Sequence, residues 1–303
     1  MSTPDNARPL DEGQEWFIGG QDRQLDDDAQ LEQLASYIDA HYELPDFTPP
    51  WKGGAGDPAP ADNYCAQLPD RVTHAAMMVL GTGVDHSLPG VAFTRDVEQT
   101  DLPELPACQF SSTQETAHSG TWVVSLHSGG WWRGSGSALE MQWRPEVAAA
   151  VGLSGAYAVD LDYPLAPQHT VGQMLEAVAK AVEYCRAQGA DKVVVWGYSS
   201  GAALAALAAP LADALVLTFP DFDALAALPD ELRAGHALPD PKSWPTTFLQ
   251  LARQDEVAAH PDVKGSHITT RDYAGRHRFQ TPTVMRQRVS DVAEFLRGVS
   301  YRN

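Results

Sequence analysis

The stretch that decides the fold reads Asp191-Lys-Val-Val-Val-Trp-Gly-Tyr-Ser-Ser-Gly201, and an alanine-rich run follows it at 202–209. Four residues of high β propensity, Val193 to Trp196, lead into a Gly-x-Ser-x-Gly turn, and the alanines that follow favour a helix. A sharp turn between strand and helix exposes the serine hydroxyl and uses the flanking glycines for close backbone packing. The stretch therefore predicts that Ser199 is a nucleophile at the end of a strand.

Strand-like and helix-like segments alternate from residue 120 onward. Apolar side chains recur at helical spacing from Met174 to Cys185 and again from Met285 to Val299. Short runs of β-forming residues predict strands at Thr121–Leu126, Ala156–Leu161, Val193–Trp196, Ala214–Phe219, Thr246–Leu251 and His267–Asp272. This alternation predicts an α/β fold with a mostly parallel central sheet and helices on both faces.

The first part of the chain has a different pattern. Apolar residues on one helical face predict an amphipathic helix that begins near Asp28 and ends before Pro45. Prolines and glycines predict an extended loop from Pro45 to Pro60, and Val91–Val97 and Cys108–Thr113 are two further strand candidates. We expect residues 1–119 to be an N-terminal extension with a cap and the first strands, and residues 120–303 to be the catalytic core of one continuous domain.

Composition and charge narrow the class of protein. The 303 residues are 44% hydrophobic and 20% charged, as is usual for a soluble globular enzyme, and no apolar run approaches the ~20 residues of a membrane span. The first residues lack the basic start and apolar core of a signal peptide, so we expect a cytoplasmic protein without stable membrane insertion. A net charge of −19 argues against nucleic acid as a partner. The oligomeric state is not indicated.

The sequence contains no motif that is typical of a metal or cofactor site. The three cysteines, Cys65, Cys108 and Cys185, are too few and too scattered for a disulfide framework or a metal site. No zinc-type His-Glu spacing and no phosphate-binding glycine loop followed by Lys-Ser or Lys-Thr is present. We therefore expect neither a metal nor an organic cofactor, and a small-molecule substrate.

A glycine pair follows the predicted strand at 121–126. The loop His127-Ser-Gly-Gly-Trp-Trp132 stands where main-chain amides can point toward the nucleophile, as the oxyanion of acyl transfer requires. We predict that Gly129, Gly130 and the amide of Ser200 form the oxyanion hole. The alternative is an ordinary glycine turn.

A serine nucleophile needs a base, and the base needs an acid that orients it. In an open α/β sheet, both should come from loops at the same strand ends as the serine. Asp255 follows the predicted strand at 246–251, and His277 follows the one at 267–272. The predicted triad is therefore Ser199, Asp255 and His277, with Glu256 as the competing acid. His260 and His267 are the competing bases.

Four stretches resemble the hormone-sensitive-lipase-like esterases of the α/β-hydrolase family. They are His-Ser-Gly-Gly-Trp at 127–131, Asp-Tyr-Pro-Leu-Ala-Pro at 162–167, the turn at 197–201 and Tyr-Ala-Gly-Arg-His-Arg-Phe at 273–279. The resemblance spans residues 120–300 and implies carboxylester hydrolysis, with a cap that selects the acyl and alcohol groups. The sequence departs from the family pattern at Ser128, Pro164, Tyr198 and Ser200, which puts substrate preference and local packing in question.

Aromatic residues near these motifs are candidates for the substrate pocket. We predict that Trp131, Trp132 and Tyr198 contact the substrate, whereas Trp51 and Trp143 are equally well explained as core residues. Asp162 and Tyr163 are expected to brace the glycine loop. The sequence thus favours a serine hydrolase acting on a carboxylic ester. Two alternatives remain: an acyltransferase with the same acyl-enzyme, and a binding protein on a hydrolase scaffold.

Overall fold

The computed structural model describes the backbone of residues 16–18 and 21–23, and residues 25–81, 85–89, 96–113 and 120–300 in full. A central sheet of eight strands runs in the order β10-β9-β8-β7-β5-β6-β4-β3. Six strands are parallel, and β4 and β3 join one edge antiparallel. The predicted α/β fold with a mostly parallel sheet is confirmed.

The strands lie close to where the β-forming runs predict them. Their bounds are β3 (Val97–Leu102), β4 (Ala107–Ser112), β5 (Thr121–Leu126), β6 (Tyr157–Leu161), β7 (Lys192–Tyr198), β8 (Ala214–Thr218), β9 (Thr246–Ala252) and β10 (Ile268–Tyr273). Two short strands, β1 (Trp16–Ile18) and β2 (Gln21–Arg23), form a separate hairpin. Most of the strand candidate at 91–97 lies outside the described residues, and β3 begins at its last residue, Val97.

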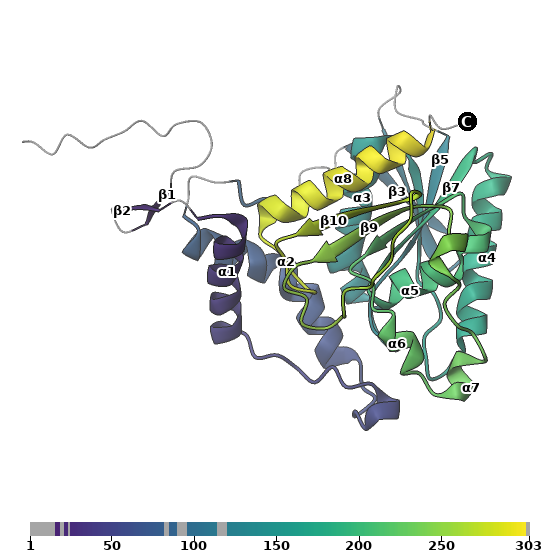
Figure 1. Cartoon of the computed structure of the whole chain (residues 1–303), viewed down its shortest axis with the longest axis horizontal. Helices are drawn as coiled ribbons and strands as arrows, with labels where there is room; N and C mark the ends of the chain where they lie inside the picture. Colours follow the sequence, from purple (N-terminus) through teal and green to yellow (C-terminus); the bar gives the residue numbers. More distant parts are fainter. Residues whose placement is uncertain are drawn as a thin grey trace, which may run out of the picture.

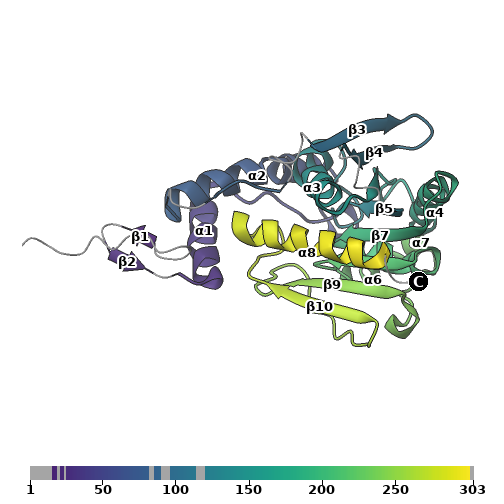
Figure 2. The same cartoon turned by 90° about the horizontal axis from the view of Figure 1, so that it is seen from above.

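Helices cover both faces of the sheet (Figure 1). One face carries α3 (Arg144–Ser154) and α8 (Pro282–Ser300), and α8 runs alongside β7 and β9 in the view from above (Figure 2). The other face carries α4 (Val171–Ala187) and α5 (Ser200–Leu207). Each strand sends alternate side chains to the two faces, because its side-chain period is two residues. Smaller elements are a π-helical turn at Leu139–Trp143, 3-10 turns at Pro50–Lys52, Ala209–Leu211 and Pro241–Ser243, and the short helices α6 (Asp223–Ala226) and α7 (Asp230–Arg233).

Strand β7 shows how this alternation builds two cores. Val193 and Val195 pack in the core beneath α4 and α5. Val194 and Trp196 pack in the core beneath α3 and α8. All four side chains are fully buried, so the strand that leads to Ser199 is held on both faces.

The N-terminal part of the structure is a pair of packed helices, α1 (Asp27–His41) and α2 (Ala59–Val79). Helix α1 begins where predicted, because the side chain of Asp26 accepts a hydrogen bond from the amide of Ala29 (2.8 Å). Its apolar face packs against α2 in a small core that Ala138 and Phe279 also join; the α1 side chains in it are Leu31, Leu34, Ala35 and Ile38. Among the described helices, none is long and apolar enough to cross a membrane.

Helix α2 is absent from the sequence prediction, and it starts within the loop predicted for Pro45 to Pro60. Its 21 residues include Pro69, a residue that usually interrupts a helix. The helical signal was nevertheless present, because Tyr64, Leu68, Val72 and Ala75 recur every three or four residues and are all buried. The rest of the predicted loop, 45–58, has no regular secondary structure apart from one 3-10 turn at Pro50–Lys52. Helices α1 and α2 lie on the side toward which the arrows of β9 and β10 point (Figure 1).

Candidate active site

Ser199 lies at the turn between β7 and α5, as predicted. Its backbone has φ 58° and ψ −119°, a strained conformation that the surrounding structure must enforce. The flanking glycines are required by close backbone contacts. A Cβ atom on Gly197 would lie 2.1 Å from the carbonyl oxygen of Gly201, and one on Gly201 would lie 2.3 Å from the carbonyl oxygen of His127. This turn therefore fixes the position of the Ser199 hydroxyl.

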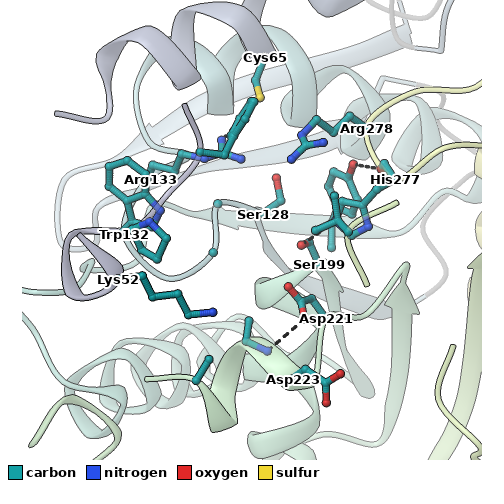
Figure 3. Close-up of a pocket in the computed structure, with 18 of the residues that line it drawn as sticks. Lys52, Cys65, Ser128, Trp132, Arg133, Ser199, Asp221, Asp223, His277 and Arg278 are labelled. Atoms are coloured by element: carbon teal, nitrogen blue, oxygen red, sulfur yellow. Dashed lines mark hydrogen bonds between the residues drawn. The ribbon is translucent and has the colours of Figure 1, made fainter. Parts of the chain in front are cut away.

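The structure brings Ser199, His277 and Asp255 together (Figure 3 shows the first two). The Nε2 atom of His277 lies 2.8 Å from the Oγ atom of Ser199. Its Nδ1 atom lies 2.8 Å and 3.1 Å from the two carboxylate oxygens of Asp255. The side chains of His277 and Asp255 are almost fully buried, so their contact is shielded from water.

Hydrogen bonds keep Asp255 in its charged form. Burial alone would raise the pKa of the Asp255 carboxyl, but hydrogen bonds from His277 and from the amides of Ala258 (2.7 Å) and Val257 (2.9 Å) outweigh this effect. The pKa therefore lies below its ordinary value. A charged carboxylate at this position can hold the imidazole and stabilise its protonated form.

The competing acid and bases have other partners. One oxygen of Glu256 accepts the backbone N–H of His277 (2.9 Å), and the other accepts a hydrogen bond from Arg278 (3.0 Å). His260 contacts the carbonyl of Ala252 (2.6 Å), and His267 contacts the carbonyl of Pro241 (3.0 Å). Glu256 thus supports the backbone of the histidine rather than its ring.

The glycine loop, residues 127–133, lies beside Ser199. Gly129 has φ 135°, and a Cβ atom there would lie 1.7 Å from the carbonyl oxygen of Arg133, so only glycine fits. Within the described part of the chain, the amides of Gly129, Gly130 and Ser200 have no hydrogen-bond acceptor. Free amides on two sides of a serine are what an oxyanion would need.

The residues expected to brace this loop contact it directly. The hydroxyl of Tyr163 donates to the carbonyl of His127 (2.8 Å), and the two rings stack with their centroids 4.2 Å apart. Asp162 accepts a hydrogen bond from Ser135 (2.7 Å), and its other oxygen is 3.6 Å from the Nε2 atom of His127. These contacts hold the start of the loop against the segment that follows β6.

A cavity of about 310 Å³ opens in front of Ser199. Of the predicted substrate contacts, Trp132 and Tyr198 line it. Tyr198 also donates its hydroxyl to the carbonyl of His277 and stacks on that ring, with centroids 5.6 Å apart. Trp51 lines the cavity as well, whereas Trp143 is buried in the core beneath α3 and α8.

The prediction that Trp131 contacts the substrate is not supported. Its side chain is fully buried in the core beneath α4 and α5, and it does not line the cavity. The cause is the backbone of the loop. Trp131 has φ 76°, and its carbonyl accepts a hydrogen bond from the amide of Ala166 (2.9 Å), so the side chain points inward.

Several polar residues of the cavity were missed from the sequence. They include Arg133 and Arg278, whose guanidinium groups lie over the ring of Phe47 at 4.6 Å and 4.2 Å from its centroid. Asp221 and Lys52 also line the cavity. The two arginines directly follow predicted site residues, Trp132 and His277, and this proximity is the only signal that the sequence offered.

Other proteins share this fold. Residues 123–239 match a protein family described as alpha/beta hydrolase fold. No curated protein sequence matches the chain. An esterase from Pyrobaculum calidifontis is 18% identical with a TM-score of 0.55, and the match covers 81% of this chain and 94% of that one.

Two further solved structures are described as hormone-sensitive lipases or esterases of that family. One comes from a metagenome library, at 16% identity and a TM-score of 0.57, over 91% of this chain and 99% of that one. The other is a bacterial esterase, at 16% identity and a TM-score of 0.52, over 89% of this chain and 98% of that one. The predicted α/β-hydrolase fold is confirmed.

Proposed function

We propose that the protein is a serine hydrolase that cleaves a carboxylic ester through an acyl-enzyme on Ser199. The observation that carries the proposal is the chain of contacts from Ser199 through His277 to Asp255, with both links at 2.8 Å. An imidazole held in this way can take the serine proton at Nε2 while the carboxylate orients Nδ1. The esterases of the same fold support the choice of an ester as the bond that is cleaved.

The reaction would run in two halves. In the first, the Oγ atom of Ser199 attacks the ester carbonyl while its proton passes to Nε2 of His277. The C–O bond then breaks, and the departing alcohol takes that proton. In the second, His277 removes a proton from water, which attacks the acyl-enzyme and releases the acid and the free serine.

The amides of Gly129, Gly130 and Ser200 would bind the negative oxygen that forms in both halves. Each of these amides is free of other acceptors within the described part of the chain. Preorganised donors of this kind are worth roughly 3–4 kcal/mol each in related hydrolases. The bracing of the loop by Tyr163 then contributes to catalysis by keeping these donors in place.

We also propose that residues 25–81 act as the cap over the site. Phe47, Trp51 and Lys52 of the extended loop and Cys65 of α2 line one side of the cavity. The other side consists of the glycine loop and the segments that follow β8, β9 and β10. The substrate would therefore lie between the N-terminal helix pair and the ends of the strands.

Two alternatives make different predictions. An acyltransferase would form the same acyl-enzyme but pass the acyl group to an alcohol instead of water. A binding protein on this scaffold would form no acyl-enzyme. The complete set of contacts around Ser199 supports an active enzyme over a binding protein.

Hydrolysis of p-nitrophenyl butyrate by the wild-type protein and by Ser199→Ala tests the proposal. We expect the variant to lose several orders of magnitude in kcat and to change little in Tm, because the substitution removes a single oxygen atom and its contact with His277. Ser111→Ala, a change on β4 away from the cavity, is the matched control. A rate in Ser199→Ala above about a tenth of the wild-type rate would contradict the proposal, since triad serines are worth far more than this. Added ethanol that captures most of the acyl group would favour the acyltransferase.

A further inference from the structure

Two arginines form one wall of the cavity. Arg133 comes from the glycine loop and Arg278 directly follows His277, and both line the cavity that contains Ser199. Both guanidinium groups lie over the ring of Phe47, with their central carbons 4.6 Å and 4.2 Å from its centroid. Figure 3 shows the two groups turned toward each other above Ser128. We call these two side chains the arginine pair.

Arg133 is buried with an incomplete set of partners. Its side chain is only 10% exposed. Its Nη1 atom lies 3.4 Å from the Oδ1 atom of Asp62 and 3.5 Å from the sulfur of Cys65. That carboxylate oxygen already accepts the amide of Gly134 at 3.0 Å. The contact is long and uses one nitrogen, whereas a strong arginine–carboxylate pair uses two.

The Asp62 carboxylate is also a weak partner for Arg133, because its burial disfavours the charged form. Burial raises the pKa of the Asp62 carboxyl more than Arg133 and Gly134 lower it. A buried cation with so weak a partner is costly unless a second anion approaches it.

The guanidinium group of Arg278 also lacks some of its hydrogen-bond acceptors among the described residues. Its Nη1 atom donates to Glu256 (3.0 Å), whose second oxygen is occupied by the backbone N–H of His277. The Nε atom of Arg278 is buried and has no acceptor among the residues that the structure describes. Each arginine therefore retains hydrogen-bond donors that no described carboxylate uses.

The opposite wall of the cavity has the opposite charge. Asp221 and Asp223 line the cavity on the far side of Ser199 from the arginine pair (Figure 3). Lys52 also lines the cavity at this end. Two aspartates and one lysine make this end less attractive to an anion than the two arginines, so the charge of the cavity favours one orientation.

We infer that Arg133 and Arg278 form a subsite for a carboxylate of the substrate, so that the preferred ester carries a negative charge beside the bond that is cleaved. Guanidinium groups suit this role because their planar donors match the two oxygens of a carboxylate. The inference rests on the proposed ester hydrolysis and adds the chemical class of the substrate. The charge belongs to either the acyl or the alcohol part, and the two arms of the test distinguish these.

The test compares esters of equal shape that differ in charge. In the acyl arm, monoethyl succinate is compared with ethyl isocaproate, in which an isopropyl group replaces the carboxylate. In the alcohol arm, acetoxyacetate is compared with isobutyl acetate. We expect a higher kcat/KM for the charged ester in one arm. Equal or lower values for the charged ester in both arms would overturn the inference.

Arg133→Met and Arg278→Met should each lower the charged-to-neutral ratio of kcat/KM by roughly 10- to 100-fold, the scale of a charge-assisted hydrogen bond. The loss should lie mainly in KM. Arg276→Met is the matched control, because Arg276 precedes His277 but points to Asp39 (2.8 Å) outside the cavity. It should leave the ratio unchanged. If the arginines only stabilise the fold, both esters will lose activity equally and the ratio will not move.

Two further measurements cover the cases in which Arg133→Met does not fold or the protein does not cleave these esters. Where Arg133→Met fails to fold, Arg133→Lys and Arg278→Met test the same ratio. Calorimetric binding of the four esters to Ser199→Ala reports the subsite without turnover. Charge-selective binding in a protein that cleaves no ester would support the subsite and contradict the hydrolase. Cleavage with a ratio that neither arginine affects would do the reverse.

Discussion

The strand-end loops and the N-terminal helix pair meet at the same cavity but contribute different things to it. The loops after β7, β9 and β10 supply Ser199, Asp255 and His277, and His277 contacts both of the others directly. Helix α2 and the loop before it supply Phe47, Trp51 and Cys65, which line the cavity. The chemistry of the site and the shape of its cavity thus come from separate parts of the chain.

The two regions are also held in place differently. The strands end in a sheet whose side chains are buried on both faces, so each loop starts from a fixed point. The helix pair has a smaller core, which Ala138 and Phe279 from the rest of the chain join, and it is also linked to that part by two ion pairs, Asp28 with Arg253 and Asp39 with Arg276. We therefore expect substitutions in the first region to affect turnover most, and those in the second to affect stability and substrate choice.

The largest effect should come from the triad acid. Asp255→Asn keeps the shape of the side chain but removes the charge that fixes the tautomer of His277. We expect kcat to fall roughly 10⁴-fold, as in other triads, when hydrolysis of p-nitrophenyl butyrate is followed.

The adjacent Glu256→Gln is the control for this change. Its amide oxygen can still accept the backbone N–H of His277, so turnover should fall far less. If Glu256→Gln lost more activity than Asp255→Asn, the acid would be assigned to the wrong residue.

The strand-end loops and the helix pair also differ in how well the sequence alone predicts them. Ser199, Asp255 and His277 could be predicted to lie together because each follows a run of β-forming residues, and parallel strands bring their ends to one edge. The order of strands along the chain therefore predicts that these three side chains meet. Gly129 and Gly130 were predicted to lie beside Ser199 for the same reason.

No comparable pattern in the sequence predicts which residues line the walls of the cavity. Phe47 and Arg133 are far apart in sequence, and only the fold places the guanidinium group over the ring. For Trp131 the sequence predicted a contact with the substrate that the structure does not support. Its backbone has a positive φ, and its side chain lies in the core and not in the cavity. Helix α2 was missed because Pro69 and the nearby loop obscured a regular apolar face.

The second prediction tests the core of the helix pair. Leu34 is fully buried between α1 and α2, so Leu34→Ala should lower the free energy of unfolding by about 2–5 kcal/mol. Leu44 lies just beyond α1 and is 58% exposed, and Leu44→Ala should change stability by less than about 0.5 kcal/mol. Urea unfolding followed by circular dichroism measures both. Equal losses would mean that the helix pair has no core of its own.

The third prediction concerns pH. The pKa of Asp255 lies below its ordinary value, so the carboxylate stays charged above about pH 4, and its contribution to stability is lost only in stronger acid. Above that pH the carboxylate therefore adds no titration of its own to the rate. We expect kcat/KM to fall about tenfold per pH unit on the acid side. A fall close to a hundredfold per unit would mean that a second essential group is titrating.

The smallest effect should come from the exposed ion pairs that link the two regions. Asp39→Asn removes the partner of Arg276, whose side chain is 30% exposed. We expect a loss of about 0.2–1 kcal/mol in unfolding free energy, which becomes smaller at high salt. A loss above about 2 kcal/mol would mean that this pair, and not the apolar packing, fixes the helix pair to the core.

Covalent labelling with a fluorophosphonate tests the central claim most directly, because the reagent forms a stable adduct only with an activated serine. We predict one adduct per chain by intact mass, located by peptide mapping to the peptide that contains Ser199, with loss of hydrolysis in proportion to labelling. Ser199→Ala should give no adduct. A folded wild-type protein that stays unlabelled, or an adduct that persists in Ser199→Ala, would contradict an acyl-enzyme on this residue.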